Sequence, residues 1–446
     1  MRILHVSQGM PPFRVGGLTK YCVDLMCEQV KQGHQVSLIY PGSYSVGKTR
    51  IKKQKINQMG IVEYKIINPL PMALVFGINK PSRYIKKCAS KCYKTLFKKE
   101  KFDVIHIHCI MGIHREFFLE AKKNGIPMIF TTHDYYVFCP RCILLKDNQK
   151  ICRTSSPTEC RECNVGKGLS KKQEIVMQSG FYEKYKYSVA MTKIRKKLRN
   201  KIKNTDKAIR ATIASVKEYE QLHKYNRSIL YLMNLIHCNS HLTEQIFRSY
   251  EPNLNYQTAS ITNLNMPKKV RHIVHKEFSI TYLGGPNIEK GFTDVIEAVS
   301  ELDDLKLDNW KLYLYGGQYD ASKINDRRIR ICGGYKAEDL KRIFQNTDVV
   351  IVYSRCYETF GFVVEEALSA GIPVIVSDRV GAKELVTSAP VNLIVPAITP
   401  HKLSKKLVEV KEKYPAILQW AQNLKITSMS EHCKEIEILY KETINQ

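Results

Sequence analysis

The sequence lacks the apolar runs that anchor a chain in a membrane, and it is poor in acidic residues. No uninterrupted apolar stretch reaches the roughly 20 residues that a membrane-spanning helix needs. The N-terminal residues Met1–Val6 turn polar too early for a signal peptide, so we expect a cytoplasmic protein. Only 42 acidic residues stand against 70 basic ones, which gives a net charge of +28. Such an excess predicts an anionic partner: phosphorylated substrates, nucleic acid or an anionic membrane surface.

Low-complexity tracts and short internal repeats are also absent, so the chain is not a repeat array. Its 446 residues, 44% of them hydrophobic, suit two or three domains with ample core. Two strand–helix–strand series fill this length. The first series opens with the strand Ile3–Val6, a loop with Gly16 and Gly17, the helix Thr19–Lys31 and the strand Val36–Tyr40. The second opens with the strand Phe278–Leu283, Gly284 and Gly285, and the helix Phe292–Glu301.

Glycines at such a strand-to-helix junction bring backbone amides close to a phosphate or a sugar, although a plain tight turn has the same pattern. The two halves look like two versions of one architecture. The sequence therefore predicts an α/β protein with two Rossmann-like parallel-sheet domains.

The stretch Tyr353–Glu384 carries the strongest functional signal. It contains Glu358, then Thr359, Phe360, Gly361 and Phe362, then Glu366. A helix that begins near Phe362 points free backbone N–H groups and a partial positive charge at whatever lies before it. Gly361 lets a ligand approach the backbone. The two carboxylates could then hold two hydroxyl-bearing parts of one ligand, with an anion between them.

This stretch resembles the donor-site motif of family 4 glycosyltransferases, which are retaining enzymes of the GT-B fold. The resemblance is carried by Glu358-Thr-Phe-Gly, by Glu366-Ala-Leu-Ser-Ala-Gly-Ile-Pro-Val, and by Gly381 and Glu384. It implies two Rossmann-like domains that face each other across a cleft. Residues 1–262 would form the acceptor domain, 263–269 the linker and 270–420 the donor domain. Residues 421–446 would form a helix that crosses back to the first domain.

The resemblance also implies roles for single residues. Glu366 would hold the nucleotide ribose, Glu358 a hydroxyl of the donor sugar, and Lys290 the diphosphate. His133, which follows the predicted strand Met128–Thr131, would lie near the transferred sugar. The other expected donor contacts are Gly16, Gly17, Gly284, Gly285, Tyr335, Thr359, Phe360, Gly361 and Phe362. A histidine at a strand end is more often structural, and Tyr335 follows two glycines that fit a plain turn equally well.

The sequence contains no Asp-x-Asp triplet, the motif with which many glycosyltransferases hold a metal. We therefore expect no catalytic cofactor. Lys290, the amides of Gly284 and Gly285, and the helix start after Gly361 would neutralise the departing diphosphate. The family usually has an arginine five residues before this lysine, where the present chain has Gly285. The departure either removes one cation from the phosphate site or means that another residue supplies it.

Five of the 14 cysteines fall in a region, about 135–210, that is composed like an insertion. They are Cys139, Cys142, Cys152, Cys160 and Cys163. The frame C-x2-C-x17-C-x2-C has the spacing of a four-thiolate zinc site. Some bacterial polysaccharide glycosyltransferases look similar here, and their shared positions correspond to Cys139, Cys152, Cys160 and Cys163. A structural zinc and a set of unmetallated thiols both remain open.

The segment Lys171–Arg210 carries thirteen basic and three acidic residues. Within it, Met191, Ile194, Leu198 and Ile202 share one helical stripe, and aromatic residues precede them. This combination is typical of an interfacial helix on an anionic membrane. A helix packed on its own domain with a solvated lysine face is the equal alternative.

From these features we expect a retaining glycosyltransferase that moves a sugar from a UDP- or GDP-sugar to a lipid-linked glycan. It would act in polysaccharide biosynthesis, peripherally on the inner face of the cell membrane. Two alternatives are a nucleotide-sugar epimerase of the same fold and a basic nucleic-acid-binding protein. The last is disfavoured because the sequence shows no module in which basic residues interleave with aromatic ones, so no nucleic-acid partner is expected.

Overall fold

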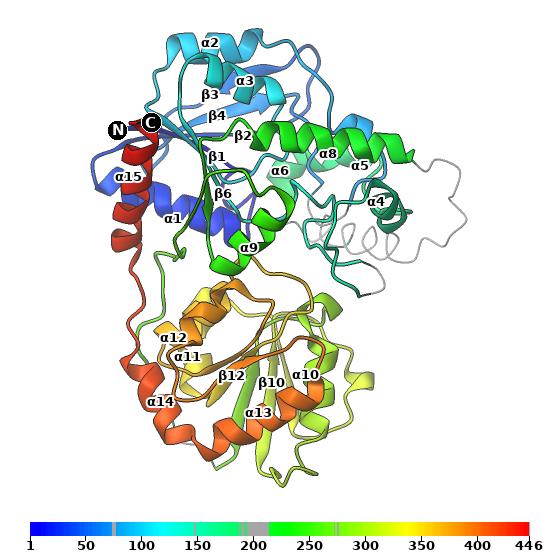
Figure 1. Cartoon of the computed structure of the whole chain (residues 1–446), viewed down its shortest axis with the longest axis vertical. Helices are drawn as coiled ribbons and strands as arrows, with labels where there is room; N and C mark the ends of the chain where they lie inside the picture. The colour runs from blue at the N-terminus through cyan, green and yellow to red at the C-terminus, as the bar shows by residue number, and fades with distance from the viewer. Residues whose placement is uncertain are drawn as a thin grey trace.

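The computed structural model describes residues 1–73, 77–146, 149–186, 188, 191, 193, 214–271, 273 and 276–445. These residues form two lobes, one above the other in Figure 1, each with its own sheet. The stripe residues Ile194, Leu198 and Ile202 lie outside the described residues, as does most of the basic segment around them. Of the described helices, none combines the length and the apolar character needed to cross a membrane.

The N-terminal lobe is built on an eight-stranded sheet with the strand order β3-β4-β2-β1-β5-β6-β7-β8. Every neighbouring pair is parallel except β3 and β4. Its strands are β1 (Arg2–Val6), β2 (Gln35–Pro41), β3 (Arg50–Lys53), β4 (Val62–Ile67), β5 (Val104–Ile107), β6 (Met128–Thr131), β7 (Leu235–Cys238) and β8 (Tyr256–Thr258). Its main helices are α1 (Gly17–Lys31), α2 (Lys91–Lys99), α3 (Arg115–Lys123), α4 (Pro157–Cys163), α5 (Lys171–Met177), α6 (Gly180–Tyr185), α8 (Val216–Leu230) and α9 (His241–Tyr250).

The C-terminal lobe has a six-stranded, all-parallel sheet with the order β11-β10-β9-β12-β13-β14. Its strands are β9 (Phe278–Tyr282), β10 (Trp310–Tyr315), β11 (Ile329–Gly333), β12 (Val349–Val352), β13 (Val374–Ser377) and β14 (Ile394–Val395). Its helices are α10 (Phe292–Ser300), α11 (Leu340–Gln345), α12 (Phe362–Ser369), α13 (Pro400–Glu412) and α14 (Tyr414–Asn423), with the 3-10 turns η4 (Ile288–Lys290) and η7 (Gly381–Val386). The last helix, α15 (Met429–Ile444), follows α14 in the chain.

The central strands explain why both sheets are parallel. In β5, β6, β9 and β13 every residue is buried. Strands covered by helices on both faces are apolar along their whole length, which is the pattern of parallel sheets in α/β proteins. The expected α/β class with two Rossmann-like sheets is confirmed.

Two elements differ from the sequence prediction. The edge strand β3 was not predicted because its sequence, Arg-Ile-Lys-Lys, is largely exposed and has no apolar pattern. The segment 421–446, predicted as one helix, contains the end of α14 and the whole of α15, which residues 424–428 separate. Ser428 caps α15 in a reciprocal arrangement with Glu431, and this capping box marks the start of a new helix.

The last helix ties the two lobes together. After α14, at the C-terminal lobe, the chain returns to the upper lobe, where α15 packs against α1 (Figure 1). The Tyr21 hydroxyl of α1 lies 2.8 Å from His432 Nε2, and Gln29 Nε2 donates to the Tyr440 hydroxyl over 3.0 Å. Buried polar contacts therefore hold α15 in one register on α1.

A buried carboxyl lies where α12 faces the segment that joins the lobes. Glu365 is only 2% exposed, and its Oε2 has no hydrogen-bond partner among the residues that the structure describes. Burial raises the pKa of Glu365 to about 8; the nearby Glu366 carboxylate raises it further, while Thr262 and Lys20 lower it by less than burial raises it. Glu365 is therefore protonated in the folded protein at neutral pH.

This proton predicts a pH dependence of stability. Between pH 4.5, the ordinary pKa, and pH 8, the folded state holds a proton on Glu365 that the unfolded state has lost. The contribution of this group to the free energy of unfolding therefore falls as the pH rises through that window, and is constant above it. Glu365→Gln keeps the neutral group at every pH. Its stability relative to wild type should rise from pH 5 to pH 8, as measured by urea unfolding.

Glu412→Gln, at an exposed position of α13, is the matched control and should show no such trend relative to wild type. A difference between Glu365→Gln and wild type that stays flat from pH 5 to pH 8 would contradict the buried proton.

Candidate functional site

The loop between β12 and α12 forms the centre of the site. Gly361 precedes α12 with a φ of 109°, and a Cβ there would lie 2.7 Å from Val380 Cγ1. Glycine alone fits both the conformation and the space. The turn places Glu358 ahead of the helix and Glu366 inside it, as the sequence predicts. Glu358 is fixed by its backbone, since its N–H donates to Arg379 O and its carbonyl accepts from Gly381 N.

Lys290 reaches this loop from η4. Its Nζ lies 2.9 Å from Glu358 Oε2. Burial lowers the pKa of Lys290, but the Glu358 carboxylate, with Cys356 and Glu289, outweighs burial and holds the pKa above its usual value. Lys290 is therefore a cation throughout the physiological range. The neighbouring Gly291 is required for this position, because its φ is 72° and a Cβ there would lie 2.0 Å from Tyr353 O.

A second lysine, which the sequence prediction missed, reaches the other carboxylate. Lys20 Nζ, from α1 of the N-terminal lobe, lies 3.2 Å from Glu366 Oε1. Burial raises the pKa of Glu366, and Lys20 opposes that rise. Each of the two motif carboxylates therefore has one lysine partner, and one of the two pairs crosses between the lobes. In the sequence, the feature that could have indicated Lys20 was a basic residue about one helical turn after Gly17.

The N-terminal lobe also binds the motif through hydrogen bonds to Thr359. The Thr359 carbonyl accepts hydrogen bonds from Ser240 Oγ at 2.7 Å and from Thr243 Oγ1 at 2.8 Å. The Thr359 hydroxyl donates to the His133 carbonyl over 3.2 Å. Both donors to the carbonyl lie at the start of α9, so three segments that are distant in sequence meet at one residue of the motif.

The predicted histidine lies at this meeting point. His133 Nε2 lies 3.2 Å from His108 Nδ1, and its ring centroid is 5.0 Å from that of Tyr21. Burial lowers the pKa of His133 to about 3, and His237 and His432 lower it further. The ring is therefore a neutral imidazole. It can accept or donate one hydrogen bond at the interface, but it cannot serve as a permanent cation.

The predicted glycines differ in what they do. Gly17 faces the motif, since a Cβ there would lie 3.2 Å from the Phe362 ring. Gly16 precedes α1 with a φ of 130°. A Cβ on Gly284 would lie 2.3 Å from the Tyr282 hydroxyl, and that hydroxyl donates to Lys290 O over 2.8 Å. Gly284 therefore makes room for a tyrosine that positions the Lys290 backbone.

The remaining predicted contacts are placed as follows. Gly285 has a left-handed φ of 69°, and a Cβ there would lie 3.0 Å from the Gly316 carbonyl oxygen, so any side chain at this position would be strained. Tyr335 lies near Glu366: burial raises the pKa of Tyr335 to about 12, and the Glu366 carboxylate adds to the rise. Phe360 is 3% exposed and packs edge-on against Phe362, so its side chain belongs to the core.

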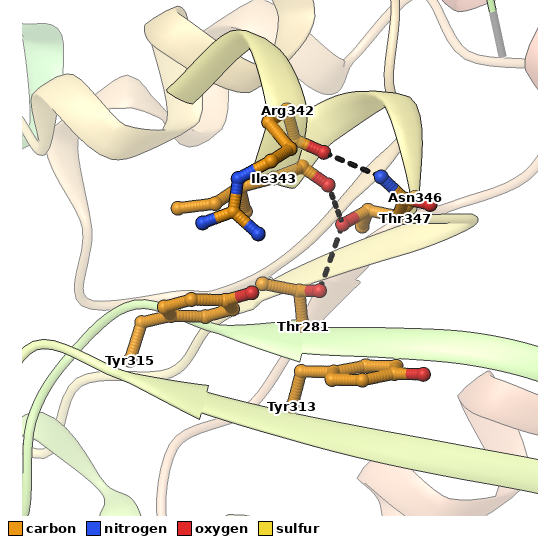
Figure 2. Close-up of a pocket in the computed structure, with 7 residues that line it drawn as sticks. All are labelled: Thr281, Tyr313, Tyr315, Arg342, Ile343, Asn346 and Thr347. Atoms are coloured by element: carbon orange, nitrogen blue, oxygen red, sulfur yellow. Dashed lines mark hydrogen bonds between the residues drawn. The ribbon is translucent and has the colours of Figure 1, made fainter. Parts of the chain in front are cut away.

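A cavity of about 230 Å³ lies away from this interface, between β9, β10 and α11 (Figure 2). It is lined by Thr281, Tyr313, Tyr315, Arg342, Ile343, Asn346 and Thr347. Hydrogen bonds within the lining occupy several of its polar groups: Thr281 to Thr347 at 2.8 Å, and Asn346 Nδ2 to Arg342 O at 2.7 Å. No predicted donor contact lines it. Its link to the site is Tyr315, whose ring is 6.1 Å from that of Tyr335.

The cysteine region closes on a small cavity of about 20 Å³. Four of the five predicted ligands line it: Cys139, Cys152, Cys160 and Cys163. Cys142 does not, and it has a left-handed φ of 65°. Burial raises the pKa of Cys152 and Cys160, and neighbouring thiols raise both further. A space of this size holds about one water molecule or one ion.

These sulfurs are nevertheless farther apart than the ligands of a bound ion. Within the described parts of the chain, the only His, Cys, Asp or Glu trio with ligand atoms all within 4.8 Å is His5, Cys22 and His108. A four-thiolate zinc site holds each sulfur about 2.3 Å from the metal. The donor set therefore fits zinc in its chemistry, and metal binding would have to draw the four sulfurs inward.

Two family models match the chain. One, described as "Glycosyl transferases group 1", covers residues 267–426, and the other, "Glycosyltransferase Family 4", covers residues 15–153. An "uncharacterized glycosyltransferase" of Methanocaldococcus jannaschii is 23% identical over 403 residues, which is 86% of this chain and 83% of that protein.

Solved structures agree on the fold. Sucrose-phosphate synthase from Thermosynechococcus elongatus superimposes with a TM-score of 0.60 at 15% identity, over 100% of this chain and 99% of that chain. Anabaena HepE in complex with UDP gives a TM-score of 0.54 at 13% identity, over 100% and 98% of the two chains. Because one family model lies on each lobe, and both lobes superimpose together on these proteins, the chain is a glycosyltransferase with the GT-B fold.

Proposed function

We propose that the protein transfers a sugar from a nucleotide-diphosphate donor to a lipid-linked glycan with retention of configuration, in polysaccharide biosynthesis. The observation that carries this proposal is the pairing of both motif carboxylates with lysines at the contact between the lobes. The structure of HepE was solved with UDP bound, which supports a uridine or related nucleotide as the leaving group. Retention and the glycan acceptor rest on the family resemblance.

The geometry fits a nucleotide sugar in the following way. The ribose hydroxyls would donate to Glu366, and a sugar hydroxyl would donate to Glu358. Donor binding would therefore release Lys290 from its carboxylate partner and turn it to the diphosphate. The free N–H groups at the start of α12 would add positive potential there. Lys20 would supply the second cation that Gly285 cannot.

The reaction forms the bond from the acceptor oxygen to the anomeric carbon and breaks the bond from that carbon to the diphosphate oxygen. The acceptor would attack on the face from which the diphosphate leaves, and the departing diphosphate oxygen would take the acceptor proton. The protein contributes preorganised charge on that oxygen, which is commonly the largest single effect in such sites. No step requires a metal.

Loss of either donor contact should therefore slow turnover strongly. Lys290→Met and Glu366→Gln should each lower kcat/KM by about 10²–10³, the usual effect of removing one preorganised electrostatic contact. Thermal-shift screening against nucleotide sugars identifies the donor, and mass spectrometry of the glycan product measures transfer. Lys341→Met, at an exposed position of α11, is the control. EDTA should not stop transfer.

Wild-type turnover by Lys290→Met would contradict this assignment. A product that is a free epimerised nucleotide sugar, with no transfer to any acceptor, would favour the epimerase alternative instead.

We further propose that Cys139, Cys152, Cys160 and Cys163 bind one structural zinc that closes the cysteine region. The cavity that these four residues share, and from which Cys142 is excluded, supports this ligand set over the one with Cys142. Four thiolates would leave no open position on the metal, so the zinc would stabilise the fold and take no part in transfer.

Elemental analysis of protein prepared without a histidine tag should find about one zinc per chain. Cys152→Ser should lose this zinc, whereas Cys142→Ser should keep it. The opposite pattern would assign the site to the other set of four, and protein without zinc or iron would leave only thiols.

We also propose that the N-terminal lobe docks on an anionic membrane through the surface of α5 and α6. Four apolar side chains are exposed there: Ile175 by 43%, Val176 by 50%, Phe181 by 65% and Tyr185 by 41%. The lysines 171, 172 and 184 are exposed beside them. Apolar and basic side chains on one surface fit the boundary of an anionic bilayer, where each lysine contributes about 1 kcal/mol.

The protein should sediment with phosphatidylserine vesicles at low salt and be released as the salt concentration rises, because salt screens the attraction. The double variant Ile175→Ser, Phe181→Ser should bind more weakly. Ile331→Ser, which removes a 41% exposed side chain from the other lobe, is the control. Equal binding by all three proteins would exclude this surface as the docking site.

A further inference from the structure

A continuous line of hydrogen bonds runs through the core of the N-terminal lobe and ends at His133. From His133 Nε2 it passes to His108 Nδ1 at 3.2 Å. His108 Nε2 then meets His5 Nδ1 at 2.9 Å, and His5 Nε2 meets Gln29 Oε1 at 2.7 Å. Gln29 Nε2 donates to the Tyr440 hydroxyl at 3.0 Å, which brings the line from β1 through α1 to α15.

The line continues from α15 back into the sheet. The Tyr440 hydroxyl lies 2.6 Å from His106 Nδ1, and His106 Nε2 lies 2.6 Å from Thr131 Oγ1. Thr131 Oγ1 lies 2.9 Å from His237 Nδ1, and His237 Nε2 lies 2.8 Å from the Ala259 carbonyl. Five histidines, one glutamine, one threonine and one tyrosine therefore form a single line, which we call the histidine line.

The far end determines the direction of every hydrogen bond in this line. The Ala259 carbonyl can only accept, so the His237 proton is on Nε2 and Nδ1 accepts from Thr131. Thr131 has then used its proton and accepts from His106 Nε2. His106 Nδ1 in turn accepts from the Tyr440 hydroxyl, which leaves the Tyr440 oxygen to accept from Gln29 Nε2.

The donor and acceptor of each remaining hydrogen bond, from Gln29 to His133, follow in the same way. Gln29 presents its oxygen to His5, so the His5 proton is on Nε2. His5 Nδ1 accepts from His108 Nε2, and His108 Nδ1 accepts from His133 Nε2. Each neutral imidazole has one proton, so all five rings carry it on Nε2 and the Nδ1 of His133 has none.

All five rings are neutral because their surroundings disfavour a second proton on each imidazole. Burial lowers the pKa of His5 and His237 to about 4 and that of His133 to about 3, and it lowers the pKa of His106 and His108 well below the usual value. Burial also raises the pKa of Tyr440, which keeps its proton. A positive charge on any of these rings would have no acid to pair with, since no carboxylate belongs to the line.

Among the described residues no hydrogen bond involves His133 Nδ1, and the side chain is only half-buried, so this nitrogen can reach a ligand. The His133 carbonyl accepts from Thr359 Oγ1 of the donor motif, which puts the residue at the contact between the lobes.

We propose that the histidine line holds His133 in the Nε2–H tautomer, so that its Nδ1 accepts a hydrogen bond from a donor-sugar hydroxyl, with Gln29 and Tyr440 as positioning residues. This inference rests on the proposed sugar transfer for its ligand, but the tautomer itself does not depend on it. A sugar hydroxyl can donate to an imidazole nitrogen that has no proton, whereas a ring with the proton on Nδ1 would present a donor to the same hydroxyl.

Tyr440 sets the orientation of the Gln29 amide. While the Tyr440 proton points to His106, its oxygen accepts from the amide nitrogen, and the amide oxygen must face His5. Without that hydroxyl, Gln29 can turn over and present N–H to His5 Nε2. His5, His108 and His133 would then each move their proton to Nδ1. A residue on the last helix therefore decides which form His133 presents at the site.

A metal ion among His5, Cys22 and His108 is the competing interpretation, because their ligand atoms lie within 4.8 Å of one another. In the structure the facing nitrogens of His5 and His108 bond to each other at 2.9 Å, which needs a proton between them. An ion there would remove that proton and interrupt the line.

The test is the tautomeric state of each ring in the full-length protein. Nitrogen-15 labelled histidine, observed through the couplings of ring nitrogens to carbon-bound protons, distinguishes Nε2–H, Nδ1–H, metal-bound and cationic rings. We expect five Nε2–H rings that do not titrate between pH 6 and 8, assigned by single substitutions. A His133 ring with its proton on Nδ1, or a metal-bound shift on His5 or His108, would overturn the proposal without any activity assay.

Tyr440→Phe tests the positioning role, with Tyr21→Phe as the matched control. Both tyrosines are fully buried and both hydroxyls bond between α1 and α15, but Tyr21 pairs with His432, outside the histidine line. Tyr440→Phe should give a mixture of His133 tautomers and lower kcat roughly tenfold, the low end of the about 10- to 100-fold loss known for partners that orient metal-bound imidazoles. Tyr21→Phe should keep the Nε2–H form and wild-type turnover.

Gln29→Leu is a second variant that breaks the line while Tyr440 itself is unchanged. It should give the same mixture of His133 tautomers. If both variants keep His133 in the Nε2–H form, the line does not position the ring and the proposal fails. If the tautomers change as expected but no sugar transfer is found with any donor, the proposed function fails while the tautomer assignment stands.

Discussion

The contact between the loop ahead of α12 and the N-terminal lobe is the constraint on which the rest of the site depends. Thr359 alone accepts from two α9 hydroxyls and donates to the His133 carbonyl. The Lys20–Glu366 pair and the packing of Gly17 against Phe362 lie at the same contact. Because the carboxyl ends of two parallel sheets face this loop, ligand groups from both lobes converge on one short segment.

Pairing the two motif carboxylates with lysines offsets the electrostatic cost of burying them. A buried carboxylate without a partner is strongly disfavoured, and it tends to bind a proton instead. Glu365 shows that outcome, with its pKa raised to about 8. Glu358 and Glu366 instead each have a lysine partner, Lys290 at 2.9 Å and Lys20 at 3.2 Å, and Lys20 opposes the rise that burial causes in the pKa of Glu366. Neighbouring positions on one helix thus carry an acid whose Oε2 has no hydrogen-bond partner among the described residues and a carboxyl paired with Lys20.

The N-terminal lobe uses the opposite strategy in its core. In the histidine line the polar groups are neutral and satisfy one another in series, so the line itself buries no charge. The cost of such a line is that each member constrains the next. Tyr440 reaches the line from α15, so the helix that returns from the C-terminal lobe also completes the surroundings of His133.

Local patterns made much of the fold predictable. The α12 motif is a contiguous stretch in which glycine, proline and carboxylate positions each have a physical reason, and the structure places them as expected. Strands such as β9 and β13 can be predicted from the sequence because burial on both faces requires a continuous run of mostly apolar residues. The exposed edge strand β3 and the break before α15 were missed, since one has no apolar period and the other depends on a single capping box.

The sequence by itself determined the two Rossmann-like sheets and the placing of Glu358 before α12 and Glu366 within it, and it pointed to Lys290, because these depend on neighbours in the chain. Only the tertiary structure decided that Lys20 partners Glu366, that Cys142 is excluded from the cysteine cavity, and that five histidines form one line. The physical reason is distance along the chain. Lys20 and Glu366 are 346 positions apart, and Tyr440 and His106 are 334 apart, so no local periodicity relates them. Their meeting follows from how the two sheets and the last helix pack.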